Sequence, residues 1–136
     1  MKLVAHIDGS CLGNPGEAGC GIVLKSEDGA VLEKAGKYLG HGTNNIAEYE
    51  GLLLCLDLAR KHGAESLTVY SDSQLLVNQV NGSYRVKQPH LQELHHQITN
   101  FLDRNKIRFQ IHYVPREKNR DADRLARDAI RNHSDV

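Results

Sequence analysis

The chain has 136 residues, of which 40% are hydrophobic and 25% charged, so it can bury a core without disulfide bonds or structural metal ions. We expect one domain spanning residues 1–136. Its 17 Lys and Arg residues balance 17 Asp and Glu residues, so a nucleic-acid partner would require locally concentrated basic groups or charge from metal ions. The sequence contains no long apolar run, which excludes the usual signature of a transmembrane helix.

The first predicted element is a strand over residues 2–8 that ends on the carboxylate of Asp8. Apolar residues occur on both faces of this strand, which is typical of the centre of a sheet. A loop rich in Gly and Asn is expected to follow over residues 9–16. A lone carboxylate at the end of a buried strand is costly, so Asp8 requires a cation, a set of donors or a metal ion. A simple turn-capping role for Asp8 is the alternative.

Two further strands are predicted over residues 19–25 and 31–39, joined by an acidic Asp-Gly turn, so the first three strands form an antiparallel meander. Thr43 or Asn44 can cap the helix that follows. This helix, predicted over residues 46–59, is apolar almost all round, as expected for a buried helix. We place Glu48 in its first turn.

The second half of the chain alternates short strands and helices. A helix that follows a hairpin and precedes a strand indicates a parallel crossover, so the fourth strand should lie beside the first. That strand ends on Asp72, and Asp123 lies in the first turn of the last helix. The predicted elements are a strand over 66–72, helices over 73–80 and 89–102, a strand over 107–113 and a helix over 120–132.

Four acids are predicted to converge. Because ligands bind outside the carboxyl ends of parallel strands, Asp8 and Asp72 should emerge together, with Glu48 and Asp123 beside them. Such a patch repels itself unless cations neutralise it, and oxygen ligands alone favour Mg²⁺ or Mn²⁺. Two ions about 3.5–4 Å apart can hold the attacking and leaving oxygens of a phosphodiester. The simpler alternatives are that Glu48 and Asp123 complement helix dipoles and that Asp72 caps the next helix.

Four stretches, Asp8–Gly16, Thr43–Glu48, Ser71–Gln74 and Asn119–Ala126, resemble the motifs of type 1 ribonuclease H, in that family's order. The resemblance implies the α/β ribonuclease H-like fold, with a five-stranded mixed sheet of a three-stranded antiparallel meander and two parallel strands, flanked by helices. It implies an endoribonuclease that cuts the RNA strand of RNA/DNA hybrids with two Mg²⁺ ions per site, or Mn²⁺, leaving 5′-phosphate and 3′-hydroxyl ends. It assigns catalysis and metal binding to Asp8, Glu48, Asp72 and Asp123.

The resemblance also assigns substrate-binding residues. RNA is distinguished from DNA through its 2′-hydroxyls, which are read by donors and acceptors in the minor groove. Thr43 and Asn44 resemble the family's pocket for a DNA phosphate. Many members have a basic, Trp-containing arm and a mobile histidine, whereas this chain has no Trp and offers Arg116, which can bind the scissile phosphate. The groups that resemble readers of 2′-hydroxyls or base edges belong to Cys11, Gly13, Asn14, Asn45 and Gln74.

Two other functions remain open from the sequence. One is a non-catalytic hybrid-binding module, which four acids facing a polyanion argue against. The other is a related metal nuclease that also acts on double-stranded RNA. The three cysteines lack a CxxC spacing and are expected to be buried small residues in a reducing, cytoplasmic protein. We expect a monomer that binds an RNA/DNA hybrid, with neither a membrane nor an obligate protein partner.

Overall fold

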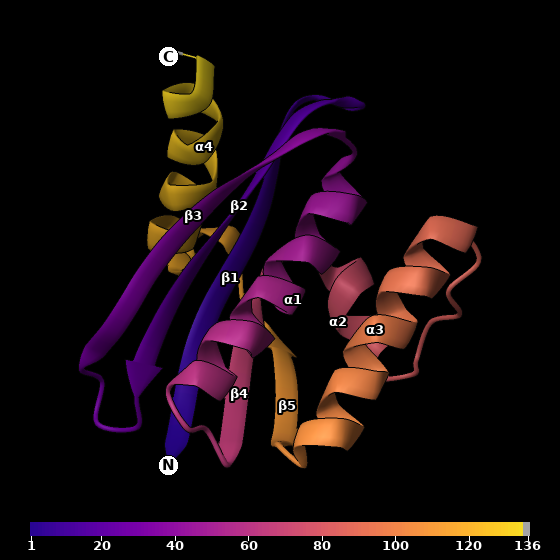
Figure 1. Cartoon of the computed structure of the whole chain (residues 1–136). Coiled ribbons are helices and arrows are strands. Elements are labelled where there is room, and N and C mark those ends of the chain that lie inside the picture. Colours follow the sequence, from indigo (N-terminus) through magenta and orange to yellow (C-terminus); the bar gives the residue numbers. More distant parts are fainter. Residues whose placement is uncertain (135–136) are drawn as a thin grey trace.

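The computed structural model describes residues 1–134, which form a five-stranded mixed sheet covered by helices on both faces (Figure 1). The strand order is β3-β2-β1-β4-β5, with β1, β2 and β3 antiparallel and β4 and β5 parallel to β1. This confirms the predicted meander and parallel pair. The last two residues of the expected domain lie outside the described part. The elements are β1 (Lys2–Gly13), β2 (Gly16–Ser26), β3 (Val31–Gly42), α1 (Asn44–Lys61), β4 (Ser66–Ser71), α2 (Gln74–Val80), α3 (Pro89–Asn105), β5 (Arg108–Tyr113), the 3₁₀ turn η1 (Arg116–Lys118) and α4 (Arg120–Ser134).

Strand β1 is longer than its sequence suggests. The predicted loop over residues 9–16 is wrong, because β1 stays paired with β2 as far as Gly13 opposite Gly16. Strand β4 pairs with β1 only up to Ile7. The Gly in this stretch reflects a close approach rather than a loop, since a Cβ on Gly9 would lie 2.4 Å from the backbone nitrogen of Glu48. Backbone pairing needs no side chain, so the ladder continues through these residues.

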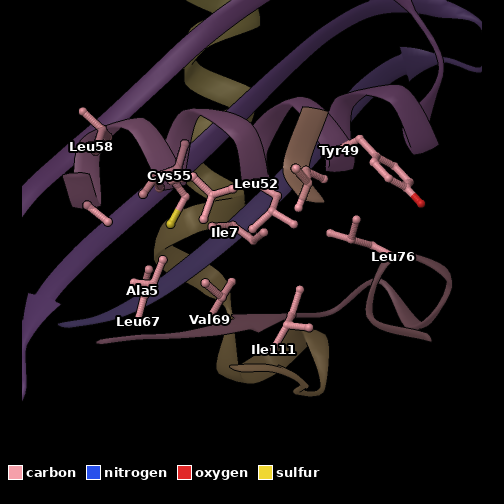
Figure 2. Packing of buried hydrophobic residues seen from close by; sticks show 14 of the residues in the cluster. Ala5, Ile7, Tyr49, Leu52, Cys55, Leu58, Leu67, Val69, Leu76 and Ile111 are labelled. Atoms are coloured by element: carbon pink, nitrogen blue, oxygen red, sulfur yellow. The ribbon is translucent and has the colours of Figure 1, made fainter. Parts of the chain in front are cut away.

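Helix α1 covers one face of the sheet and forms the core with it. Its buried side chains, among them Leu52, pack onto residues of β1, β4 and β5 such as Ile7, Val69 and Ile111 (Figure 2). The Thr43 hydroxyl caps the helix by accepting a hydrogen bond from the Ile46 N–H at 3.2 Å. The helix therefore begins at Asn44, earlier than predicted, and the expectation that Glu48 lies in its first turn is wrong.

Helix α4 covers the opposite face and contacts β1, β2 and β3 (Figure 1). It buries Ala122, Ala126 and Ile130. The sheet carries glycines beneath it, and a Cβ on Gly21 would lie only 2.3 Å from the Ala122 carbonyl oxygen. Small residues on both sides thus let the helix backbone rest directly on the strands.

Two further sequence expectations concern cysteines and membranes. Cys20 and Cys55 are buried and Cys11 is half-buried, and all three are free thiols. Within residues 1–134, no helix combines the length and apolar character needed to cross a bilayer.

Candidate active site

Asp8 and Asp72 emerge together from neighbouring parallel strands. Ile7 of β1 lies opposite Ser71 of β4, so the two acids occupy the next position along each chain. Asp72 does not cap α2, because the Ser73 hydroxyl accepts the capping hydrogen bond from the Leu76 N–H at 3.1 Å. The capping alternative is therefore wrong, and the Asp72 carboxylate lies in the acid cluster instead.

Glu48 approaches the same point from α1. Its side chain is only 9% exposed and that of Asp8 only 4%. One carboxylate oxygen from each of Asp8, Glu48 and Asp72 can be chosen so that all three lie within 4.8 Å of one another. The Glu48 Oε2 atom is buried and has no hydrogen-bond partner in the described structure. A buried, unpartnered carboxylate oxygen carries a full desolvation cost, which a bound cation would remove.

The electrostatics of this cluster favour a cation. Burial is the largest cause, and together with the charges of Glu48 and Asp72 it raises the pKa of Asp8 to about 11. Burial also raises the pKa of Glu48 to about 8, with Asp72 contributing. These groups resist ionising together at neutral pH unless positive charge is brought between them. Because the donors are all carboxylate oxygens, the cluster fits a hard divalent cation.

Asp123 lies at the edge of this cluster. It is in the first turn of α4, as predicted, and is nearly buried. Its Oδ2 atom forms an ion pair with Arg127 Nη2 at 2.7 Å, and its Oδ1 atom lies 3.8 Å from Arg116 Nη2. Its side chain also helps to raise the pKa of Asp8, which it adjoins. Within residues 1–134, Asp123 is therefore the one predicted acid that forms ion pairs.

Asn119 fixes the position of α4 relative to β1. Its side-chain nitrogen donates to the Ile7 carbonyl oxygen at 2.8 Å, directly before Asp8. The side chain is buried, and its Oδ1 atom has no partner in the described residues. Sequence reasoning quoted Asn119 only as part of a motif and gave it no role. An Asn immediately before a predicted helix is the signal that indicates such a role.

A cleft surrounds the acids and contains part of the predicted substrate-binding set. Cys11, Asn44, Asn45 and Arg116 line it, whereas the other four predicted binding residues do not. Four of its lining residues, Gly9, Ser10, Ser73 and Tyr113, were not predicted as site residues, because only their position in space brings them to the cleft. The full lining is Asp8, Gly9, Ser10, Cys11, Asn44, Asn45, Glu48, Asp72, Ser73, Tyr113, Arg116 and Asp123.

The predicted binding residues outside the cleft lining are Gly13, Asn14, Thr43 and Gln74. Asn14 Oδ1 accepts a hydrogen bond from the Asn44 N–H at 3.1 Å, which joins the β1–β2 turn to the start of α1. Asn14 thereby positions Asn44. Gln74 is exposed at the start of α2, and its assignment to substrate stays a prediction.

Comparisons with known proteins agree with this geometry. The family described as reverse transcriptase-like matches residues 6–129. A bifunctional protein of Mycobacterium tuberculosis is 43% identical over 131 residues, which cover 96% of this chain and 36% of the relative. Ribonuclease HI of Halobacterium salinarum is 36% identical over 133 residues, covering 95% of this chain and 64% of the relative. The chain thus spans about a third to just under two thirds of the length of these relatives.

Among solved structures, LC11 ribonuclease H1 in complex with an RNA/DNA hybrid superposes with a TM-score of 0.93 and 36% sequence identity. The match covers 97% of this chain and 99% of that one. The similarity extends over all five strands and includes the elements that carry the acids. The chain therefore belongs to the reverse transcriptase-like family, and it has the fold and compact form of a type 1 ribonuclease H domain.

Proposed function

We propose that the chain is an endoribonuclease that hydrolyses the RNA strand of RNA/DNA hybrids, leaving 5′-phosphate and 3′-hydroxyl ends. The observation that carries this proposal is the buried carboxylate cluster, with the unpartnered Glu48 Oε2 atom, in a cleft between β1, β4, α1 and α4. A similar protein, LC11 ribonuclease H1, has been solved with a hybrid bound. We propose an RNA/DNA hybrid as the substrate of this chain as well.

The carboxylates of Asp8, Glu48 and Asp72, with Asp123 beside them, would hold two Mg²⁺ ions, and Mn²⁺ would be accepted by the same donors. When bound, the ions would supply charge neutralisation and orientation of the attacking and leaving oxygens. Burial lowers the local dielectric constant around the cluster and so strengthens its hold on a divalent charge. When the ions are bound, Asp123 would give up an ion pair with an arginine and interact with a metal ion instead.

The other groups would orient the substrate. Arg116 lines the cleft, lies 3.8 Å from Asp123 and is 75% exposed, so its guanidinium is free to bind the scissile phosphate. The N-terminus of α1 presents Asn44 and Asn45 to the cleft, where backbone N–H groups favour a phosphate. Cys11 and Asn14 would contribute groups that read the minor groove. We further propose a monomeric, cytoplasmic protein without a membrane or obligate protein partner.

Cleavage of strand-labelled duplexes tests the proposal. We expect nicking of the RNA strand of a hybrid with Mg²⁺ or Mn²⁺, none with chelator, and none of double-stranded DNA. Cleavage of double-stranded RNA as well would widen the substrate class without changing the chemistry. Tight binding of the hybrid without cleavage under either metal would favour the non-catalytic binding module instead.

A further inference from the structure

One charged surface plays no part in the proposed reaction. Helix α4 carries four exposed arginines, spaced three or four residues apart and therefore on one side of the helix. We call Arg120, Arg124, Arg127 and Arg131 the arginine stripe. At a rise of about 1.5 Å per residue, the stripe extends along the helix for roughly 16 Å.

The opposite side of α4 holds the stripe in place. Ala122, Ala126 and Ile130 are fully buried against the sheet. Gly21 lets the helix backbone rest directly on β2, so the side of the helix around Ala122 and Ala126 is held against the sheet. The arginine side therefore faces away from the sheet on a rigid element, visible in Figure 1 as the yellow helix at the C-terminal end.

The stripe is continuous with the active-site cleft. Arg116 and Asp123 line both the cleft and a second hollow on its α4 side. A third hollow continues further along the helix. The second hollow is lined by Arg116, Glu117, Arg120, Asp123, Arg124 and Arg127. The third is lined by Arg124, Arg127, Asp128 and Arg131.

Half of the stripe is paired with acidic residues. Arg127 pairs with Asp123 at 2.7 Å, and Arg131 pairs with Asp128 at 3.5 Å. Among the described residues, Arg120 and Arg124 form no ion pair. The chain as a whole has a formal net charge of zero, so this run of arginines is a local concentration and not a general excess of basic residues.

Two features of the stripe weaken helix α4, while Asp121 and Asp123 in its first turn offset part of this loss through the helix dipole. Arg120 is in the first turn, where the helix dipole disfavours a cation. Like charges three and four residues apart also repel one another along the stripe. A polyanion lying on this side of α4 would relieve both effects, because arginine guanidinium groups bind phosphate in forked geometry.

We propose that the arginine stripe binds the phosphate backbone of the hybrid where the duplex leaves the cleft on the α4 side. This inference rests on the proposed function, because the ligand is the same hybrid. At about 3.4 Å per phosphate along one strand, the stripe is long enough to follow roughly five phosphates. It adds affinity beyond the cleft and takes no part in bond cleavage.

The test compares two matched double variants, Arg120→Gln/Arg124→Gln in the stripe and Arg104→Gln/Arg108→Gln as the control. All four arginines are exposed, and Arg108 begins β5 at the edge of the sheet away from Asp72. Affinity for a fluorescent hybrid is measured by anisotropy in chelator over a range of salt concentrations. Binding is thus measured without any cleavage.

For the stripe variant we expect the slope of log affinity against log salt to fall in magnitude by about two, and the dissociation constant to rise about fivefold or more at 0.1 M salt. The control variant should bind like the wild type. With metal, KM of the stripe variant should rise while kcat stays unchanged. Asp128→Asn, which frees Arg131, should tighten binding and steepen the slope.

Equal slopes for the wild type, the stripe variant and Asp128→Asn would overturn the inference. Thermal unfolding shows whether each variant is folded. Asp128→Asn is an independent test, because it is expected to increase the affinity for the hybrid whereas the stripe variant decreases it. If the wild type binds through the stripe but does not cleave, the proposed function fails alone. If the wild type cleaves but the stripe variant matches the control, the inference fails alone. A wild type that binds no hybrid would overturn both.

Discussion

The buried acid cluster should make the metal-free protein less stable as pH rises. Burial, with the charge of Asp72, raises the pKa of Glu48 from 4.5 to about 8. The folded protein therefore keeps a proton that the unfolded chain releases, and the free energy of unfolding falls as pH rises from 4.5 toward 8. Each pKa unit corresponds to about 1.4 kcal/mol, so the full shift of Glu48 sets a ceiling of about 5 kcal/mol on the contribution of this one group. Relaxation around the site leaves an expected loss of about 2–4 kcal/mol.

Urea unfolding in chelator at pH 5 and pH 8 measures this loss. Glu48→Gln removes the ionising group, so this variant should be more stable than the wild type at pH 8 and less dependent on pH. Adding Mg²⁺ should restore stability to the wild type at pH 8. Glu93→Gln, at an exposed position on α3, is the matched control and should change nothing. A metal-free wild type equally stable at both pH values, with no gain in Glu48→Gln, would refute the reasoning.

The remaining predictions concern packing and capping. Gly21→Ala places a Cβ 2.3 Å from a backbone oxygen of α4 and should destabilise the fold by about 1–3 kcal/mol, whereas Gly42→Ala, with its nearest neighbour at 3.7 Å, should be tolerated. Leu52→Ala empties a fully buried position and should cost about 2–5 kcal/mol, while exposed Leu12→Ala should cost almost nothing. Thr43→Ala removes the cap of α1 and should cost about 1 kcal/mol. Urea unfolding checks all three, and equal effects for a variant and its control would contradict the packing argument.

The order of the elements was predictable because each leaves a local signal. The alternation of residues 107–113 and the apolar composition of residues 46–59 specify a strand and a buried helix without tertiary information. Two predicted strands ending on acids, at Asp8 and Asp72, were enough to place a site at one edge of a parallel pair, even though β1 itself continues to Gly13.

The errors arose where tertiary contacts override local signals. Gly9 was interpreted as a loop residue, yet its lack of a side chain serves the approach of α1 to β1. Glu48 was assigned to the first turn of α1 but lies beyond it. The sequence offers both Thr43 and Asn44 as the capping residue, and the folded structure uses Thr43. Tyr113 and Ser10 enter the cleft only through the sheet register, which no local pattern encodes.

Cleavage by Asp72→Asn tests the central claim most directly, namely that the converging carboxylates carry out hybrid hydrolysis. Asp72→Asn keeps the shape of the side chain but removes one anionic ligand from the cluster. Asp103→Asn, at an exposed position on α3, removes the same charge away from the site. With Mg²⁺ present, we predict that Asp72→Asn binds the hybrid but no longer nicks its RNA strand, while Asp103→Asn cleaves like the wild type. Equal cleavage by both variants would contradict the account.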